Sequence, residues 1–473
     1  MGIQPGDKIA IASRNCSNWV VSYMAIMSYK AVAVTLLQDF KAEDLARLIE
    51  HSDSKMLIVG PYVWRELRHQ QLPELQAIMS MDDFSFIHLA EPYKGNVEHV
   101  MNEASTLTEN TFFSLVQDGE IDMDSLALIN YTSGSTGLPK GVMIKQDSIT
   151  NYIKPTPENS PINAIANDVS KMLSITTASF IAFLREAFAS VMNGVPMVLA
   201  DEEASMNPIR LANLIKEHGI DGMSATPSRL QQYLTIDDFK RVLNDIKVIT
   251  IGGEKFIESL YPTLVKYTNA DIYNSYGPTE VTIASHAKLM KDSNVSEGKP
   301  IHNTIDLIVD LDNNPLPDHI VGNIAIGGVG VSSGYWNKPE LTEKAFYIKN
   351  GIPYYNTGDL GYKRDDGELV VVGRADSQIK LRGLRIETGE IENVILKNSG
   401  IDLVFVNVQV INDTEYLCAY YVADSEIDTN KLKEDISQEL TDYMIPTFFI
   451  QLDELPLNPN GKLDRKKLPL PSI

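Results

Sequence analysis

Residues 131–141 read Tyr131-Thr132-Ser133-Gly134-Ser135-Thr136-Gly137-Leu138-Pro139-Lys140-Gly141. The glycines let backbone N–H groups approach an anion closely, the hydroxyls add hydrogen-bond donors, and the lysine adds positive charge. An apolar run, Leu126-Ala127-Leu128-Ile129, comes directly before and predicts the buried strand that leads into this loop. The stretch therefore predicts a loop that holds phosphate at the end of a strand.

Two other interpretations of this loop fit less well. A Walker A loop has a glycine five residues before a Gly-Lys-Ser/Thr, whereas Lys140 follows a proline and precedes Gly141. A flexible Ser/Gly linker would not predict the Pro-Lys-Gly ending or the flanking strand. We therefore expect a phosphate-binding loop of another type.

Composition limits the class of protein. The chain has 473 residues, of which 44% are hydrophobic and 22% charged, as in a globular protein with two or more domains. Its formal net charge of −22 argues against nucleic acid or an anionic membrane as a partner, because both would repel it. The two cysteines, Cys16 and Cys418, have no metal-ligand or redox spacing, which indicates a reduced, cytoplasmic protein.

One stretch has the length of a membrane span. Residues 19–37 are largely apolar, but Lys30 lies in their middle and no basic leader precedes them. We expect a buried helix over 19–29 and a buried strand over 31–36, and hence no transmembrane segment.

Residues 1–375 alternate apolar runs with amphipathic stretches, the pattern of a large, layered α/β domain. The runs at 8–12, 55–59 and 246–251 are expected to be strands. The segment begins at Gly2-Ile3-Gln4-Pro5-Gly6-Asp7 and looks truncated at its start, as in a domain excised from a longer chain. A short natural protein is the alternative.

Residues 376–473 predict a second, small α+β domain. Valines at every second position from Val404 to Val410 indicate a strand with one buried face. Apolar residues at 432, 436 and 440 recur at helical spacing. We expect Thr429 to cap this helix and Pro446 to end it.

Further blocks give the chain a resemblance to a known family. With the loop at 131–141, they are similar to the motifs of adenylate-forming enzymes, and most closely to the adenylation domains of nonribosomal peptide synthetases. They follow the order of that family and cover residues 126–468. The blocks read Asn274-Ser275-Tyr276-Gly277-Pro278-Thr279-Glu280, Gly322-Asn323-Ile324-Ala325-Ile326, Gly334-Tyr335-Trp336-Asn337-Lys338-Pro339-Glu340-Leu341-Thr342, Tyr355-Asn356-Thr357-Gly358-Asp359-Leu360, Gly373-Arg374-Ala375-Asp376-Ser377-Gln378-Ile379-Lys380-Leu381-Arg382-Gly383 and Asn460-Gly461-Lys462-Leu463-Asp464-Arg465.

The resemblance implies two half-reactions on a large N-terminal domain and a small mobile C-terminal domain. First, a carboxylate attacks the α-phosphate of ATP, which gives an acyl-adenylate and pyrophosphate. Then the phosphopantetheine thiol of a carrier protein attacks the acyl group. ATP and Mg²⁺ are the implied cofactors, and the partners are a small carboxylic or amino acid, a carrier protein domain and neighbouring synthetase domains.

The resemblance also implies roles for single residues. Lys462 matches the catalytic lysine that bridges the carboxylate and the α-phosphate. Asp359 matches the residue that accepts hydrogen bonds from the ribose hydroxyls, which suits an acceptor-only carboxylate, and Arg374 matches a cationic contact to the nucleotide. Glu280 would hold Mg²⁺ through an oxygen ligand.

The rest of the nucleotide site follows in the same way. Tyr276 would stack on adenine, Asn274 would read the edge of the base, and Thr279 would contact phosphate. The implied nucleotide-binding residues are Thr132, Ser133, Gly134, Ser135, Thr136, Gly137, Lys140, Gly253, Asn274, Tyr276, Gly277, Thr279, Asp359 and Arg374. For the thioester step, the small domain would rotate about Asp376 as the pivot and present the segment that contains Lys380.

Substrate choice depends on the segment around Ile181. If this segment is helical, Ile181 and Arg185 share a face. Most relatives that activate α-amino acids have aspartate at the position of Ile181, where it pairs with the substrate ammonium. Isoleucine cannot form that pair, and an unpaired ammonium in a pocket is costly, which disfavours an ordinary α-amino acid. The implied pocket is Ile181, Ala182, Arg185, Ser224, Thr250, Gly252, Ser275, Ile283 and Ala284.

Arg185 has two interpretations. It could pair with an acidic group of the substrate, or with Glu186 or Asp201 at the edge of the pocket. The second is favoured by the usual solvation of arginines on helices. Two further departures from the family pattern, Gln146 for a histidine and Asn356 for a basic residue, matter less.

Three functions compete. A synthetase adenylation domain would load a carrier protein, a freestanding acyl-CoA ligase would use soluble coenzyme A, and a non-catalytic module would only bind nucleotide. The match of residues 373–383 and 460–465 to synthetase domains favours the first. The retention of Lys462, Asp359 and Glu280 argues against the third.

Overall fold

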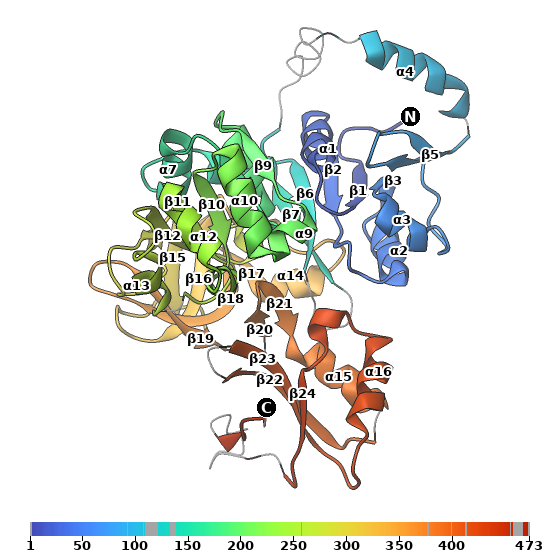
Figure 1. Ribbon diagram of the computed structural model, residues 1–473. Helices are drawn as coiled ribbons and strands as arrows, with labels where there is room; N and C mark the ends of the chain where they lie inside the picture. The colour runs from blue at the N-terminus through green and yellow to red at the C-terminus, as the bar shows by residue number, and fades with distance from the viewer. Residues whose placement is uncertain are drawn as a thin grey trace. The chain divides into compact units, whose positions relative to one another are not determined.

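The computed structural model describes residues 2–91, 93–106, 108, 122–132, 139–256, 258–375, 378–398, 400–411, 414–454, 456 and 467–471. They form two compact units. One is made of the chain up to Thr132 and of Lys140–Gly373, and the other of Pro139 and the described residues from Arg374 onwards. Figure 1 labels the elements of both. The sequence predicts domains over residues 1–375 and 376–473, and these limits stay a prediction.

The first sheet of the first unit has seven strands among the described residues and is parallel except at its edges. There, β4 pairs with β5, and β6 with β7, in antiparallel fashion. The predicted strands at 8–12 and 55–59 are confirmed as β1 and β3, and the helix predicted at 19–29 is α1 (Ser17–Ser28). The order is β5 (Phe86–Leu89), β4 (Ala77–Ser80), β3 (Ser54–Val59), β1 (Lys8–Ala12), β2 (Val32–Thr35), β6 (Leu126–Thr132) and β7 (Lys140–Lys145).

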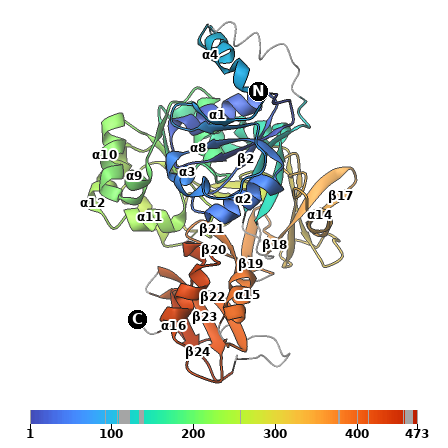
Figure 2. The same ribbon diagram turned by 90° about the vertical axis from the view of Figure 1, so that its right-hand side faces the viewer.

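The two faces of this sheet are covered differently. Ile9 and Ile11 of β1 pack into a core with Trp19 and Tyr23 of α1, because side chains alternate between the faces of a strand. Residues 10 and 12 face the other way, towards α2 (Ala42–His51) and α3 (Pro61–Leu67). Figure 2 shows these two helices in front of the sheet.

The second sheet also has seven strands within the described residues, and its central strands run parallel. Its order is β14 (Lys299–Pro300), β13 (His286–Leu289), β12 (Asp271–Tyr276), β11 (Val248–Gly252), β10 (Gly222–Ala225), β8 (Met172–Ser174) and β9 (Met197–Leu199). The strand predicted at 246–251 is β11. Its helices are α6 (Gln146–Ile153), α7 (Ser160–Asp168), α8 (Phe183–Val191), α9 (Glu202–Met206), α10 (Pro208–His218), α11 (Pro227–Tyr233), α12 (Asp237–Val242) and α13 (Leu260–Leu264).

Helices on both sides close the second sheet. One cluster packs α10 and α12 on the outer face (Figure 1). On the inner face, α8 meets α1 of the first sheet, and the rings of Tyr23 and Phe183 lie 6.4 Å apart. The two sheets therefore share one core, and residues 183–190 of α8 are buried in it.

A third sheet completes the first unit. It contains β15 (Thr304–Val309), β16 (Gly322–Gly328), β18 (Ile352–Lys363), β17 (Phe346–Lys349) and β19 (Leu369–Arg374), with α14 (Pro339–Ala345) before β17. The hydroxyl of Thr357 donates a hydrogen bond of 2.9 Å to the carbonyl of Ile324, which fixes β18 beside β16. The long strand β18 carries Asp359 near its end.

The second unit packs two helices on small sheets. Its elements are β20 (Gln378–Leu381), β21 (Leu384–Glu387), α15 (Thr388–Asn398), β22 (Leu403–Ile411), β23 (Thr414–Val422), α16 (Thr429–Ser437) and β24 (Phe448–Gln451). The predicted valine strand is β22. Two details were wrong: Asp428, not Thr429, caps α16, because its side chain accepts from the N–H groups of Asn430 and Lys431. The helix ends at Ser437, well before Pro446.

In the parts of the chain that the structure describes, no helix has both the length and the apolar character that a membrane crossing needs. The predicted strand over 31–36 lies inside the first sheet as β2, with all four of its residues buried. The apolar stretch at 19–37 therefore supplies core, as predicted.

Candidate active site

The ends of β6 and β7 hold the predicted phosphate loop. Thr132 and Lys140 are direct partners in the antiparallel pair, and the buried Oγ1 of Thr132 has no hydrogen-bond partner. The Nζ of Lys140 lies 5.4 Å from the ring centre of Tyr335. The predicted residues Ser133, Gly134, Ser135, Thr136 and Gly137 lie outside the described residues.

Tyr276 and Asp359 meet inside the first unit. The hydroxyl of Tyr276 donates a hydrogen bond of 2.5 Å to Oδ2 of Asp359, and both side chains are buried. Burial, and then the charge of Asp359, raise the pKa of Tyr276 well above its ordinary value, so the phenol stays protonated. The N–H of Asp359 donates to the hydroxyl of Thr357. Two predicted nucleotide-binding motifs, at 274–280 and 355–360, are thereby joined.

The side-chain nitrogen of Asn274 is already hydrogen-bonded within the protein. Its Nδ2 donates to the carbonyl of Ser296 at 2.8 Å and to the carboxylate of Glu297 at 3.0 Å. Its Oδ1 is buried without a partner. An amide held in this way can offer only an acceptor, which matches the exocyclic amino group of adenine.

The backbone passes closely at Gly277. A Cβ there would lie 2.6 Å from the Cα of Ala284 and 2.8 Å from the nitrogen of Ser285, so only glycine fits. Gly253 has a left-handed φ of +84°, which also favours glycine. The next predicted residue, Thr279, begins a short 3₁₀ turn that also contains Glu280.

Glu280 is fully buried and positioned by Tyr335. The hydroxyl of Tyr335 donates a hydrogen bond of 2.8 Å to Oε1 of Glu280. Because Lys140 lies over the ring of the same tyrosine, Tyr335 connects the β6–β7 end to the predicted Mg²⁺ ligand. Tyr335 lies in the motif at 334–342, which predicted no role for it. Its partner lies 55 residues away, so local sequence held no signal for the contact.

Several predicted pocket residues stand on adjacent parallel strands. Ser224 of β10 is paired with Thr250 of β11, and their hydroxyls are hydrogen-bonded. Gly252 is paired with Ser275 of β12, and a Cβ on Gly252 would lie 2.6 Å from the Ser275 carbonyl. The Oγ of Ser275 is buried without a partner. These four residues therefore line up across three strands, as a pocket wall requires.

The other side of the predicted pocket begins a helix. Arg185 N–H donates to the carbonyl of Ala182, and Ala182 is the N-cap of α8. Ile181 is half-buried against the large core that also contains Ile283 and Ala284. Of the two, Arg185 lies in the helix and Ile181 in the turn before its N-cap, so the predicted shared face stays a prediction.

Arg185 differs from the favoured interpretation. Its side chain is only 6% exposed instead of solvated, and its Nε is buried without a hydrogen-bond partner. Glu186 instead accepts from the Ser174 hydroxyl and from the N–H groups of Ile175 and Thr176. The prediction that Arg185 is solvated was wrong, because α8 lies inside the core and side chains on all its faces are buried there.

The second unit carries the remaining predicted residues. Arg374 ends β19 and is half-buried. Lys380 stands on β20, opposite Arg385 of β21. Asp376 and Lys462 lie outside the described residues.

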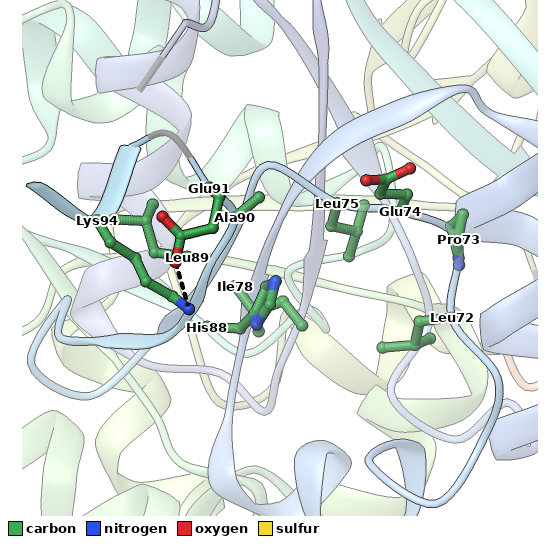
Figure 3. A pocket seen from close by; sticks show the side chains of 10 residues that line it. All are labelled: Leu72, Pro73, Glu74, Leu75, Ile78, His88, Leu89, Ala90, Glu91 and Lys94. Carbon is green, nitrogen blue, oxygen red and sulfur yellow. Dashed lines mark ion pairs between the residues drawn. The ribbon is translucent and has the colours of Figure 1, made fainter.

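A pocket of about 490 Å³ lies by β4 and β5, at the edge of the first sheet that is opposite β7 (Figure 3). Figure 3 shows Lys94 turned towards Glu91, with which it forms an ion pair of 3.0 Å, and His88 between this pair and Leu72. None of its lining residues is a predicted site residue.

Comparison with known proteins decides the family. The profile of the AMP-binding enzymes matches residues 1–336, and that of the AMP-binding enzyme C-terminal domain matches residues 390–462. The chain belongs to the AMP-binding enzyme family. The predicted resemblance to adenylate-forming enzymes is therefore confirmed.

Relatives of this AMP-binding enzyme include large synthetases. It is 34% identical over 481 residues to a dimodular nonribosomal peptide synthase of Bacillus subtilis (strain 168), covering 100% of this chain and 19% of that protein. It is 32% identical to tyrocidine synthase 3 of Brevibacillus parabrevis, over 99% of this chain and 7% of that protein. The chain thus spans about a fifth or less of the length of these relatives.

Solved structures share the fold of this AMP-binding enzyme. The amide bond synthetase McbA from Marinactinospora thermotolerans superposes with a TM-score of 0.81 at 21% identity, over 98% of this chain and 90% of that chain. A four-domain nonribosomal peptide synthetase bound to AMP and glycine gives a TM-score of 0.65 at 28% identity, over 100% of this chain and 33% of that chain. The predicted fold class, a large N-terminal α/β part and a small C-terminal α+β part, is confirmed.

Proposed function

We propose that this chain activates a carboxylic or amino acid as an acyl-adenylate, with release of pyrophosphate, and passes the acyl group to the phosphopantetheine thiol of a carrier protein. The observation that carries the proposal is the convergence of separate motifs in the first unit. Tyr276 joins Asp359, and Tyr335 joins Glu280 beside Lys140. Two buried carboxylates that act as acceptors, and a cation, suit the sugar and phosphates of a nucleotide.

The first half-reaction needs positioning and positive charge. A carboxylate oxygen of the acid bonds to the α-phosphorus, the bond between the α-phosphate and its bridging oxygen breaks, and pyrophosphate leaves with the electron pair. Lys462 would neutralise charge that develops during this step, and Lys140 would hold the phosphates. Asp359, held by Tyr276, would accept hydrogen bonds from the ribose.

Mg²⁺ fits the buried carboxylate of Glu280. This ion keeps several waters and is usually held by one or two carboxylates plus substrate phosphates. Glu280 offers such a carboxylate, and within the described ranges no group of three or more His, Cys, Asp or Glu side chains forms a protein-only metal site. When bound, Mg²⁺ would offset the negative charge of the phosphates.

In the second half-reaction the thiolate sulfur bonds to the acyl carbon, and the bond from that carbon to AMP breaks. Rotation about Asp376 would present the segment that contains Lys380 for this step. The names of the relatives favour a carrier domain over free coenzyme A as the acceptor, and neighbouring synthetase domains as partners. A cytoplasmic location, with nucleic acid and membranes excluded as partners by charge, belongs to the same proposal.

The test measures pyrophosphate release and traps the adenylate with hydroxylamine. The panel pairs α-amino acids with their des-amino, keto and hydroxy counterparts. Acid-dependent release, followed by loading of a carrier domain but not of coenzyme A, is expected. Preference for coenzyme A would establish the ligase alternative, and nucleotide binding without release for any acid would establish the non-catalytic one.

A further inference from the structure

Arg185 is a buried cation that interacts with the neighbouring carboxylate of Glu186 through charge alone, without an ion pair or a hydrogen bond between them. It stands on the first turn of α8 and is 6% exposed. Its Nε is enclosed and has no hydrogen-bond partner, and no ion pair joins its guanidinium to a carboxylate in the parts of the chain that the structure describes. Since guanidinium stays charged inside proteins, this arrangement is unfavourable unless a ligand completes it.

The two acidic side chains nearest in sequence are committed elsewhere. Glu186 accepts four hydrogen bonds, from the hydroxyls of Ser174 and Thr176 and from the N–H groups of Ile175 and Thr176, at 2.6–3.0 Å. Asp201 accepts from the N–H of Ala204 and caps α9. Neither carboxylate hydrogen-bonds to Arg185.

The predicted pocket offers Arg185 no anion. Its other members are Ile181, Ala182, Ser224, Thr250, Gly252, Ser275, Ile283 and Ala284, which are all uncharged. Ser275 presents a second buried polar atom without a partner, its Oγ. Among the predicted pocket residues, Arg185 therefore supplies the charge, and Ser275 adds a hydroxyl without a hydrogen-bond partner.

A neighbouring phenol points to the same ligand chemistry. Burial raises the pKa of the Tyr152 phenol on α6, and the charge and hydrogen bond of Arg185 offset only part of this rise. The hydroxyl therefore stays protonated and can act as a donor. A guanidinium beside a protonated phenol suits a planar anion that accepts several hydrogen bonds.

We propose that Arg185 binds a second carboxylate on the acid that this chain activates. The substrate class is then a dicarboxylic acid, or another acid with a carboxylate on its side chain, and the carboxylate at Arg185 is not the one that is adenylated. This inference rests on the proposed function and names its substrate class.

The test compares acids that differ only in the second carboxylate. Glutarate is paired with pentanoate, and glutamate with glutamine, in pyrophosphate-release assays on the full chain. We expect kcat/KM to be roughly 100-fold higher for the acid with two carboxylates, the size of a hydrogen-bonded charge contact. Arg185→Met should abolish this preference, and Arg185→Lys should keep part of it. The exposed Arg210→Met on α10 is the matched control.

Binding of the acids is measured separately by calorimetry, without ATP. Selective binding of the two-carboxylate acids that Arg185→Met removes would uphold the inference, even where adenylate never forms and the proposed function fails. Equal turnover of the two-carboxylate acids and their neutral counterparts by the wild type would overturn the inference and leave the function intact. Arg185→Lys serves if the methionine variant does not fold. A preference for two-carboxylate acids that persists in both Arg185→Met and Arg185→Lys also overturns the inference.

Discussion

The hydroxyl of Tyr276 donates a hydrogen bond of 2.5 Å to Oδ2 of Asp359, across 83 residues of chain. The tyrosine ends β12 of the second sheet, and the aspartate stands on β18 of the third. The bond therefore fixes the proposed ribose acceptor to the strand end that carries Asn274. It also means that Tyr276 holds a carboxylate, a role that the expectation of stacking on adenine did not include.

Replacing Tyr276 by phenylalanine should raise the KM for ATP by about tenfold or more and lower the free energy of unfolding by roughly 1–3 kcal/mol. The reason is that a buried carboxylate loses its donor. Kinetics with varied ATP and thermal unfolding measure the two effects. Tyr347→Phe is the control, because the buried hydroxyl of Tyr347 has no partner and its ring stacks on Tyr354. Equal effects of both variants would contradict the prediction.

Tyr335→Phe should shift the Mg²⁺ concentration that gives half-maximal activity upwards, by roughly 10-fold. A group that orients a metal ligand typically affects affinity by that much, and Tyr335 is the donor that holds Glu280. Titration of activity with Mg²⁺ at saturating ATP measures the shift. Tyr267→Phe, whose ring lies against Lys240 elsewhere in the unit, should leave the titration unchanged. An unaltered Mg²⁺ titration of Tyr335→Phe would remove its positioning role.

Lys462→Ala should leave ATP binding largely intact and lower the adenylation rate by roughly 100-fold or more, the usual effect of losing charge stabilisation. Pyrophosphate release and nucleotide binding, measured on the same preparation, separate the two steps. Lys431→Ala, at an exposed position on α16, is the control. Normal turnover of Lys462→Ala would remove the catalytic assignment.

Acid stability should depend on Asp306. Burial acts to raise its pKa, but His286 and Lys363 outweigh it, so the pKa lies below the ordinary 3.8; the Lys363 ion pair measures 2.9 Å. The unfolded chain then binds more protons below about pH 4, and the stability from Asp306 is lost as pH falls through its folded-state pKa. Asp306→Asn should cost roughly 1–3 kcal/mol at neutral pH and flatten the acid limb.

Unfolding in denaturant at several pH values from 3 to 7 tests this. Asp318→Asn, at an exposed position, should leave the curve unchanged. An acid limb of the same slope in Asp306→Asn would show that other carboxylates dominate.

Local patterns were sufficient to predict where the strands and helices lie, but not all of their ends. The apolar runs at 8–12 and 55–59 became β1 and β3, because a strand buried on both faces needs only a short continuous apolar stretch. The N-cap of α16 is Asp428, one residue before the predicted Thr429. Aspartate and threonine are both good caps, and the sequence alone does not choose between them.

Local sequence patterns could not predict side-chain hydrogen bonds between residues that are far apart in the chain. The resemblance placed Tyr276, Asp359 and Glu280 in one site, but it did not predict the hydrogen bonds that hold them. The two residues of each bond lie 83 and 55 positions apart in the chain. Arg185 shows the same limit. Its burial depends on α8 lying between two sheets, and nothing in its own helix signals that position.

The backbone of the turn that follows Glu280 affects how the proposed acid pocket could be redesigned. Thr282 and Ile283 have φ values of 59° and 73°, a left-handed backbone that β-branched side chains rarely adopt. Glycine or asparagine at 283 would relieve that strain and at the same time enlarge the proposed acid pocket. Efforts to widen the range of accepted acids at this position should therefore gain stability as they lose selectivity, the reverse of the usual trade-off in enzyme engineering.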